Sequence, residues 1–371
     1  MRARGRNAGG PAAGKAMLVS VSAVRNIRRR RWRPVWPPRP RHPEVPALSL
    51  LTAPKPVIAV VGVGAVGGYY GAKLIRAGHD VHLLLRADYE AVRRDGLNVR
   101  SDVEEGFHLP SGELRVYSDP ADAPKADLVL VCLKATGNAA YEPLVGPLLK
   151  DDSTILTIQN GLGNEDQLAD LFGADRVTGG MAFVCIHRTG PGLIHHIDHG
   201  FLKIGEHVPA GGSPPGATPR VERAAELFRS AGVRCDVLDD LRRGRWEKLL
   251  WNIPFNGLGA ALDLATDRLI GSADGVALLT AIMREVAAVA AADGVPLPPE
   301  LIDRQITHTA TMGAYRSSMQ LDRQAGRPLE VEAILGEPVR RAQKLGVPVP
   351  ATEALYRMVR LMDPAGAAAG Q

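Results

Sequence analysis

The chain has 371 residues, of which 45% are hydrophobic and 23% charged. These values are ordinary for a soluble globular protein with two or three domains, and they exclude collagen, a coiled coil and a wholly disordered chain. No stretch approaches 18 uncharged apolar residues, so we expect no transmembrane helix. The three cysteines are widely spaced and suit neither a disulfide framework nor zinc ligation, so a cytoplasmic protein is the default.

Positive charge is concentrated at the N-terminus. The first 50 residues carry 12 lysines and arginines against one acid, a net charge of +11, so the rest of the chain sums to −6. Prolines follow the arginine-rich run, and there are too few apolar residues to offset the entropy of ordering. We predict that residues 1–56 are a disordered basic extension. An arm that binds nucleic acid or an acidic membrane is the alternative, whereas the charge of the folded body predicts neither partner.

Order is predicted to begin at Val57–Val61, a continuous β-branched run that is typical of a buried parallel strand. A glycine-rich turn, a helix and a second strand over 81–85 follow. The turn reads Gly62-Val63-Gly64-Ala65-Val66-Gly67. A G-x-G-x-x-G run between a strand and a helix predicts a dinucleotide-binding loop. Its glycines permit a tight turn, close approach to the pyrophosphate and close packing of the helix, in that order.

The end of the second strand predicts which dinucleotide binds. Arg86 follows the strand directly, and Asp88 comes two residues later. A cation here favours the 2′-phosphate of NADP, whereas an acid would bind the ribose 2′-hydroxyl of NAD. We therefore predict NADP(H) as the cofactor, with NAD as the alternative that Asp88 leaves open.

Two more buried strands are predicted over 128–133 and 154–158. Lys134 follows the first directly, and Asn160 follows the second after Gln159. Ligands of open parallel sheets bind beyond the carboxyl ends of the strands, so both residues are candidates for contact with cofactor or substrate. A loop lysine and a turn asparagine are the alternatives. The pattern favours an α/β fold with a Rossmann-type doubly wound sheet.

The strand-like segment 177–207 carries five histidines. They are His187, His195, His196, His199 and His207. A metal cluster would need several of them on one face, but adjacent residues of a strand point to opposite faces. We therefore predict no metal site.

From Asp239 onward the pattern is helical. Lys248, Asn252 and Asn256 stand four residues apart, which places them on one broad face of a helix that Pro254 is expected to kink. Buried polar groups need partners, and a substrate could supply them. A stripe that faces solvent is the alternative. By themselves, Ser318 reads as an N-cap and Glu330 as a first-turn acid.

Taken together and in order, these residues resemble the ketopantoate reductase (2-dehydropantoate 2-reductase) family over about residues 57–362. The resemblance rests on the glycine loop, Cys132-Leu133-Lys134, Asn160-Gly161-Leu162-Gly163, the Lys248/Asn252/Asn256 spacing, Ser317-Ser318-Met319-Gln320-Leu321-Asp322, and Glu330. It implies NADPH-dependent reduction of 2-dehydropantoate to (R)-pantoate in pantothenate and coenzyme A synthesis. It also implies an NADP-binding Rossmann domain over 57–238 and a helical substrate and catalytic domain over 239–371.

The resemblance also implies roles for single residues. Lys248 matches the catalytic lysine, which would act as general acid, and Glu330 matches the acid that supports it. Asn160, Asn252, Asn256 and Ser318 match substrate-binding positions, and Asp322 matches a supporting one. Arg86, Lys134, Asn160 and Glu330 match positions on the cofactor side, together with the glycine loop. A small-molecule 2-oxo acid is the expected partner, and the protein is expected to be a monomer or a homodimer.

Two alternatives stay open. Gly257-Leu258-Gly259-Ala260 stands where the family often has Pro-Leu-Thr-Ala, which leaves room for another 2-oxo acid or ketone as the substrate. A non-catalytic nucleotide sensor whose basic tail binds a partner is the second alternative.

Overall fold

The computed structural model describes residues 48–209 and 211–364. Most of the predicted basic extension therefore lies outside the described residues. Within its last part, helix α1 (Ser49–Thr52) precedes the first strand, and Leu50 is fully buried in the hydrophobic core. The folded part of the chain thus begins before Val57, where it was predicted to begin, because Leu50 of α1 belongs to the hydrophobic core.

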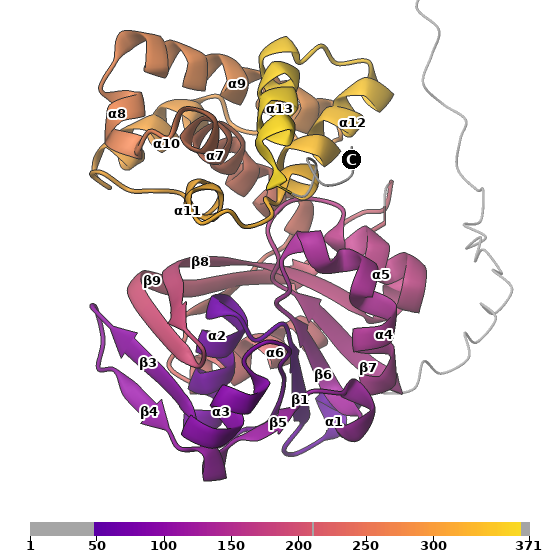
Figure 1. Ribbon diagram of the computed structural model, residues 1–371. Coiled ribbons are helices and arrows are strands. Elements are labelled where there is room, and N and C mark those ends of the chain that lie inside the picture. Colours follow the sequence, from indigo (N-terminus) through magenta and orange to yellow (C-terminus); the bar gives the residue numbers. More distant parts are fainter. Residues whose placement is uncertain (1–47, 210, 365–371) are drawn as a thin grey trace, which may run out of the picture. The chain divides into compact units, whose positions relative to one another are not determined.

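A ten-stranded sheet forms the body of the N-terminal half (Figure 1). Its strands are β1 (Val57–Val61), β2 (Asp80–Leu84), β3 (Leu97–Ser101), β4 (Phe107–Leu109), β5 (Arg115–Tyr117), β6 (Ala126–Val131), β7 (Leu149–Thr157), β8 (Val177–Gly190), β9 (Leu193–Glu206) and β10 (Cys235–Val237). Their order is β4-β3-β9-β8-β7-β6-β1-β2-β5, with β10 paired to β9. All neighbours from β5 to β8 are parallel.

The parallel part of the sheet has the Rossmann order. The chain runs outward from β1 to β2 and β5, then crosses back to β6 and continues to β7 and β8. The direction therefore reverses between β1 and β6, and ligands of such sheets bind beyond the strand ends at this reversal. The predicted doubly wound fold is confirmed.

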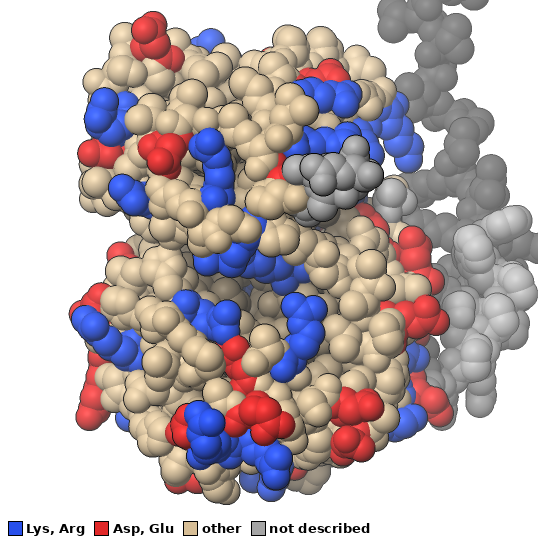
Figure 2. Space-filling view, viewed as in Figure 1, with Lys and Arg blue, Asp and Glu red and all other residues tan. Residues whose placement is uncertain are grey.

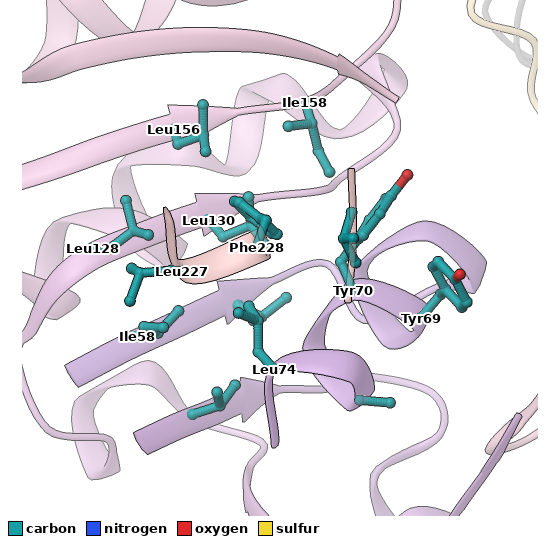
Figure 3. Packing of buried hydrophobic residues seen from close by; sticks show 14 of the residues in the cluster. Ile58, Tyr69, Tyr70, Leu74, Leu128, Leu130, Leu156, Ile158, Leu227 and Phe228 are labelled. Carbon is teal, nitrogen blue, oxygen red and sulfur yellow. The ribbon is translucent and has the colours of Figure 1, made fainter. Parts of the chain in front are cut away.

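Hydrophobic side chains of the central strands alternate between two cores. In β1, Ile58 and Val60 belong to one core, and Ala59 and Val61 belong to the other. Successive side chains of a strand point to opposite faces, so a sheet covered on both sides needs an unbroken apolar run. Figure 3 shows the first core, in which Tyr70 and Leu74 of α2 and Phe228 of α6 pack on the strands.

Among the described residues, six α-helices accompany the sheet. They are α1, α2 (Ala65–Arg76), α3 (Tyr89–Asp95), α4 (Tyr141–Val145), α5 (Asn164–Phe172) and α6 (Pro219–Ser230). The core on one face draws on α2 and α6, and the core on the other face draws on α4 and α5.

From Asp239 on, the described residues form only helices and loops, as the sequence predicts. The helices are α7 (Leu241–Leu262), α8 (Thr266–Ile270), α9 (Ala273–Ala292), α10 (Glu300–Ala310), α11 (Ser318–Gln324), the π-helical turn η6 (Glu332–Gly336), α12 (Glu337–Leu345) and α13 (Pro350–Met362). They enclose a hydrophobic core of their own. Helix α7 continues through Pro254.

Helix α9 is long and apolar enough to cross a membrane by length and composition alone. Leu279, Ile282, Met283 and Val286 lie in the core of the helical half. Glu285, near the middle of α9, accepts hydrogen bonds from the backbone of Ala351 and Thr352 at the start of α13. Helix α9 is therefore built into the folded helical half.

Candidate active site

The glycine-rich loop joins β1 to α2 at the point where the sheet reverses direction. Gly62 has φ +91°, and the Gly64 N–H donates to its carbonyl at 2.9 Å, which makes the tight turn. A Cβ on Gly67 would collide with the Gly62 carbonyl, whereas a Cβ on Gly64 would meet nothing within 4 Å. Val63 and Val66 pack against the core, and Ala65 starts the helix. The loop therefore leaves open space beside the backbone at Gly64.

This open space fits a pyrophosphate. No side chain caps the N-terminus of α2, so the N–H groups of its first turn are free to bind phosphate oxygens. Arg86 is exposed just past β2, and among the described residues no side chain pairs with it. The buried Asp88 instead accepts a hydrogen bond from Arg188 at 2.5 Å. Of the two residues predicted to recognise the cofactor, Asp88 is engaged and only Arg86 is free, and a free cation at this position fits NADP.

Lys134 lies where the two halves of the molecule meet. It stands after β6, at the start of the 3-10 helix η3 (Ala135–Ala140), and forms an ion pair with Asp322 of α11. Asp322 also accepts a hydrogen bond from Arg327 at 2.9 Å. The Asp322 carboxylate therefore binds both the Lys134 ammonium and the Arg327 guanidinium. Figure 2 shows lysine and arginine side chains around a hollow between α11 and α2, a setting that suits anionic ligands.

Lys248 and Glu330 are joined through Asn160. The Lys248 Nζ donates to Asn160 Oδ1 at 2.9 Å and to the Ala182 carbonyl of β8 at 2.7 Å. Asn160 also lies beside the Glu330 carboxylate, whose pKa it acts to lower, and this carboxylate accepts the Ala135 N–H at 2.8 Å. Lys248 and Glu330, which lie 88 and 170 positions after Asn160 in the chain, thus meet at its amide. The Lys248 ammonium faces the carboxyl edge of the sheet.

Burial changes the acidity of both ionisable groups. The pKa of Lys248 is lowered to about 7, because burial disfavours the ammonium and the nearby Arg245 cation repels it, while Glu330 acts in the opposite direction. Burial also raises the pKa of Glu330, against the effects of the Ala135 N–H and Lys134. A lysine with a pKa near neutrality can both donate and accept a proton at physiological pH.

Asn252 and Asn256 lie on the same side of α7 as Lys248. They are only 6% and 3% exposed. Among the described residues, neither side chain has a hydrogen-bond partner. Neither amide is fully enclosed by the protein, however. Their amides therefore reach solvent-accessible space, and a bound ligand could supply the missing partners.

The two serines at the start of α11 have different positions. Ser317 is the N-cap, and its hydroxyl accepts the Gln320 N–H at 3.4 Å. Ser318 is the first helical residue and is exposed. The capping role that the sequence suggests for Ser318 thus belongs to Ser317, so the Ser318 hydroxyl is not needed as the cap.

Two residues beside Lys248 were missed by sequence reasoning. Phe183 of β8 lies under the ammonium, with its ring centroid 4.9 Å from Nζ. Arg245 is buried, forms an ion pair with Glu165 and donates to the Gln159 carbonyl at 2.6 Å. Its position three residues before Lys248 was a usable signal, because residues at that spacing are neighbours on a helix. No local signal pointed to Phe183.

Two adjacent histidines of β9 have partners outside any metal site. His195 contacts Asp102 at 2.8 Å, and the buried His196 contacts Ser101 at 3.0 Å. These partners lie at the end of β3 and directly after it, in a segment for which the sequence predicted no element. Within residues 48–209 and 211–364, no three histidine, cysteine or acidic side chains gather as metal ligands would.

Comparison with known proteins gives the family. The model "Ketopantoate reductase PanE/ApbA" matches residues 58–209, and "Ketopantoate reductase PanE/ApbA C terminal" matches residues 240–363. The chain is 42% identical to a 2-dehydropantoate 2-reductase of Nostoc sp. over 305 residues, which cover 82% of this chain and 94% of that protein. A solved 2-dehydropantoate 2-reductase of Geobacter metallireducens is 44% identical with a TM-score of 0.78, covering 82% of this chain and 99% of the other. The one from Methylococcus capsulatus is 34% identical with a TM-score of 0.73, covering 82% and 96%. With both halves matched by its models, the chain belongs to the ketopantoate reductase family.

Proposed function

We propose that the protein reduces 2-dehydropantoate to (R)-pantoate with NADPH, as a step of pantothenate and coenzyme A synthesis. The contact of Lys248 with Asn160 carries this proposal, because it brings a cation of the helical half to the carboxyl edge of the sheet. The relatives named above support the choice of substrate. A cytoplasmic enzyme, either monomer or homodimer, fits this function.

The two halves divide the work. Residues 57–238 hold the cofactor through Gly62–Gly67 and Arg86. Lys134 and Asn160 of this half, together with Glu330 of the helical half, lie at the end of the cofactor that faces the substrate. NADPH, when bound, supplies the hydride. Residues 239–371 hold the 2-oxo acid: the amides of Asn252 and Asn256 and the hydroxyl of Ser318 bind its polar groups. Asp322 supports the site by pairing with Lys134.

Lys248 supplies the proton. Negative charge grows on the ketone oxygen as the hydride arrives, and a charged ammonium beside that oxygen stabilises the charge and then protonates it. The Ala182 carbonyl and Asn160 hold Nζ in place, and Asn160 is itself held by Glu330. Glu330 is therefore a positioning residue that acts through the amide.

The proposed reaction is tested by NADPH oxidation with 2-dehydropantoate, beside a panel of other 2-oxo acids at equal concentration. We expect kcat/KM for 2-dehydropantoate to exceed all others. A higher value for a different 2-oxo acid would keep the chemistry and replace the substrate. Absence of NADPH oxidation with every 2-oxo acid would contradict the assignment as a reductase.

The pH dependence of the reduction follows from Lys248. Because its pKa is about 7 and the charged form donates the proton, kcat/KM for reduction should be constant at lower pH and fall as pH rises through 7. Oxidation of pantoate needs the neutral amine and should rise over the same range. Initial rates from pH 5.5 to 9 measure both directions. If kcat/KM of Lys248→Met falls over the same pH range as that of the unaltered protein, a group other than Lys248 titrates.

Arg86 sets part of the preference for NADP(H). Because its guanidinium is exposed and free of partners among the described side chains, Arg86→Gln should raise KM for NADPH about tenfold and leave KM for NADH nearly unchanged. Arg93→Gln is the matched control, because Arg93 is an exposed arginine of α3. Equal effects on both cofactors would contradict a role in binding the 2′-phosphate.

A further inference from the structure

The tip of the β8–β9 hairpin is packed closely on α3. The Asn98 N–H donates to the Gly192 carbonyl at 2.9 Å. Gly192 has φ +66°, and a Cβ there would lie 2.9 Å from the Gly96 carbonyl oxygen and 3.2 Å from a methyl group of Val92. This close fit fixes the hairpin tip beside α3, the helix that follows the end of β2.

Asp88 ties this hairpin to the start of α3. It occupies the N-cap position of α3, where an aspartate normally accepts N–H groups of the first turn, but its side chain makes no such bond. Its carboxylate instead accepts from Arg188 Nη1 at 2.5 Å and from the Gly192 N–H at 3.4 Å. The side chain is 9% exposed. The acid nearest the end of β2 is therefore already engaged by the hairpin.

Arg188 keeps most of its hydrogen-bonding capacity. Its side chain is 45% exposed, and the contact with Asp88 uses one N–H of the five that a guanidinium carries. Asp88 is two residues from Arg86 along the chain, so a second guanidinium is held near the carboxyl end of β2. The charges of Arg86, Arg188 and Asp88 leave a net positive charge there.

We propose that Arg188 determines cofactor specificity in two ways. It engages the Asp88 carboxylate, which would otherwise bind the ribose 2′-hydroxyl of NAD, and it offers its remaining N–H groups to the 2′-phosphate of NADP. Planar guanidinium groups bind phosphate through paired hydrogen bonds, and a cation that is already held by a neighbour loses less freedom when it does so. The proposal rests on the proposed use of NADP(H).

The test measures nucleotide binding without catalysis. The dissociation constants of NADP⁺ and NAD⁺ are determined by calorimetry for the full chain and for Arg188→Gln, Asp88→Asn and the control Arg93→Gln. In Arg188→Gln the affinity for NADP⁺ should fall by about tenfold or more, while NAD⁺ binds as well as before or better, since Asp88 is released. In Asp88→Asn the preference for NADP⁺ should be kept or increased, because the amide oxygen can still accept a hydrogen bond from Arg188 while the competing carboxylate charge is gone.

The opposite responses of the two variants separate specificity from packing. If the ion pair only fastens the hairpin, both variants should lower the Tm and weaken both nucleotides equally, and this result would overturn the proposal. An unchanged NADP⁺ to NAD⁺ ratio in Arg188→Gln would overturn it as well. Equal binding of both nucleotides by the unaltered protein would instead refute the proposed cofactor preference, before any variant is compared.

Discussion

Lys248→Met is expected to lower kcat for the reduction by about 10²–10⁴-fold, the usual contribution of a positioned proton donor. Methionine retains most of the side-chain volume but removes the charge and the two hydrogen bonds to Asn160 and the Ala182 carbonyl. The glycine loop that is proposed to bind the dinucleotide does not involve Lys248. The dissociation constant of NADPH, measured by fluorescence titration, should therefore change by no more than about twofold, which is less than the loss of a typical hydrogen bond would cause.

Arg243→Gln provides the matched control on the same helix. Arg243 is exposed and pairs with Glu247 one turn along α7, away from the proposed site. Its kcat should equal that of the unaltered protein. Full turnover in Lys248→Met would remove this residue as the proton donor, and a large loss of NADPH affinity would indicate damage to the fold of the site.

Glu165→Ala is expected to cause the largest loss of stability. Glu165 and Arg245 are 5% and 3% exposed and form an ion pair that joins α5 to α7. Removal of the carboxylate leaves the Arg245 guanidinium buried with the Gln159 carbonyl as its remaining partner. An uncompensated buried charge costs about 3–5 kcal/mol, so the free energy of unfolding in urea and the Tm should both fall markedly.

Two further variants serve as controls for the loss of stability in Glu165→Ala. Glu353→Ala breaks an exposed pair with Arg357 on α13 and should cost less than about 1 kcal/mol. The double variant Glu165→Leu/Arg245→Met removes both charges and should recover much of the lost stability, since apolar replacements for a buried ion pair are often neutral. A Glu165→Ala protein as stable as the Glu353→Ala control would contradict the view that this pair fastens the two halves.

Much of the fold was predictable because local pattern and tertiary role coincide. Val57–Val61 is an unbroken apolar run, and the structure uses both of its faces, since alternate residues enter different cores. The β3–β4 segment was not predicted, because its strands are short and its pairing with β9 joins residues nearly 100 positions apart. Leu50 was assigned to the extension since nothing local marks a single leucine as part of the core.

The candidate site was partly predictable for a related reason. The spacing of Lys248, Asn252 and Asn256 depends only on the helix, so their shared face could be inferred from the chain. The meeting of Lys248 with Asn160 depends on how the helical half lies against the sheet, which no local pattern encodes. The family resemblance gave each of them a role in the site but did not pair them. The engagement of Asp88 by Arg188, 100 residues away, was beyond both kinds of reasoning.

A crystal structure with NADP⁺ and (R)-pantoate tests the central claim most directly. In it, the account predicts that Lys248 Nζ lies within about 2.6–3.2 Å of the C2 hydroxyl oxygen, the reach of a proton donor. It also predicts that Asn160 still joins the lysine to Glu330. Pantoate bound elsewhere, with the Lys248 ammonium remote from its C2 hydroxyl, would contradict the proposed mechanism.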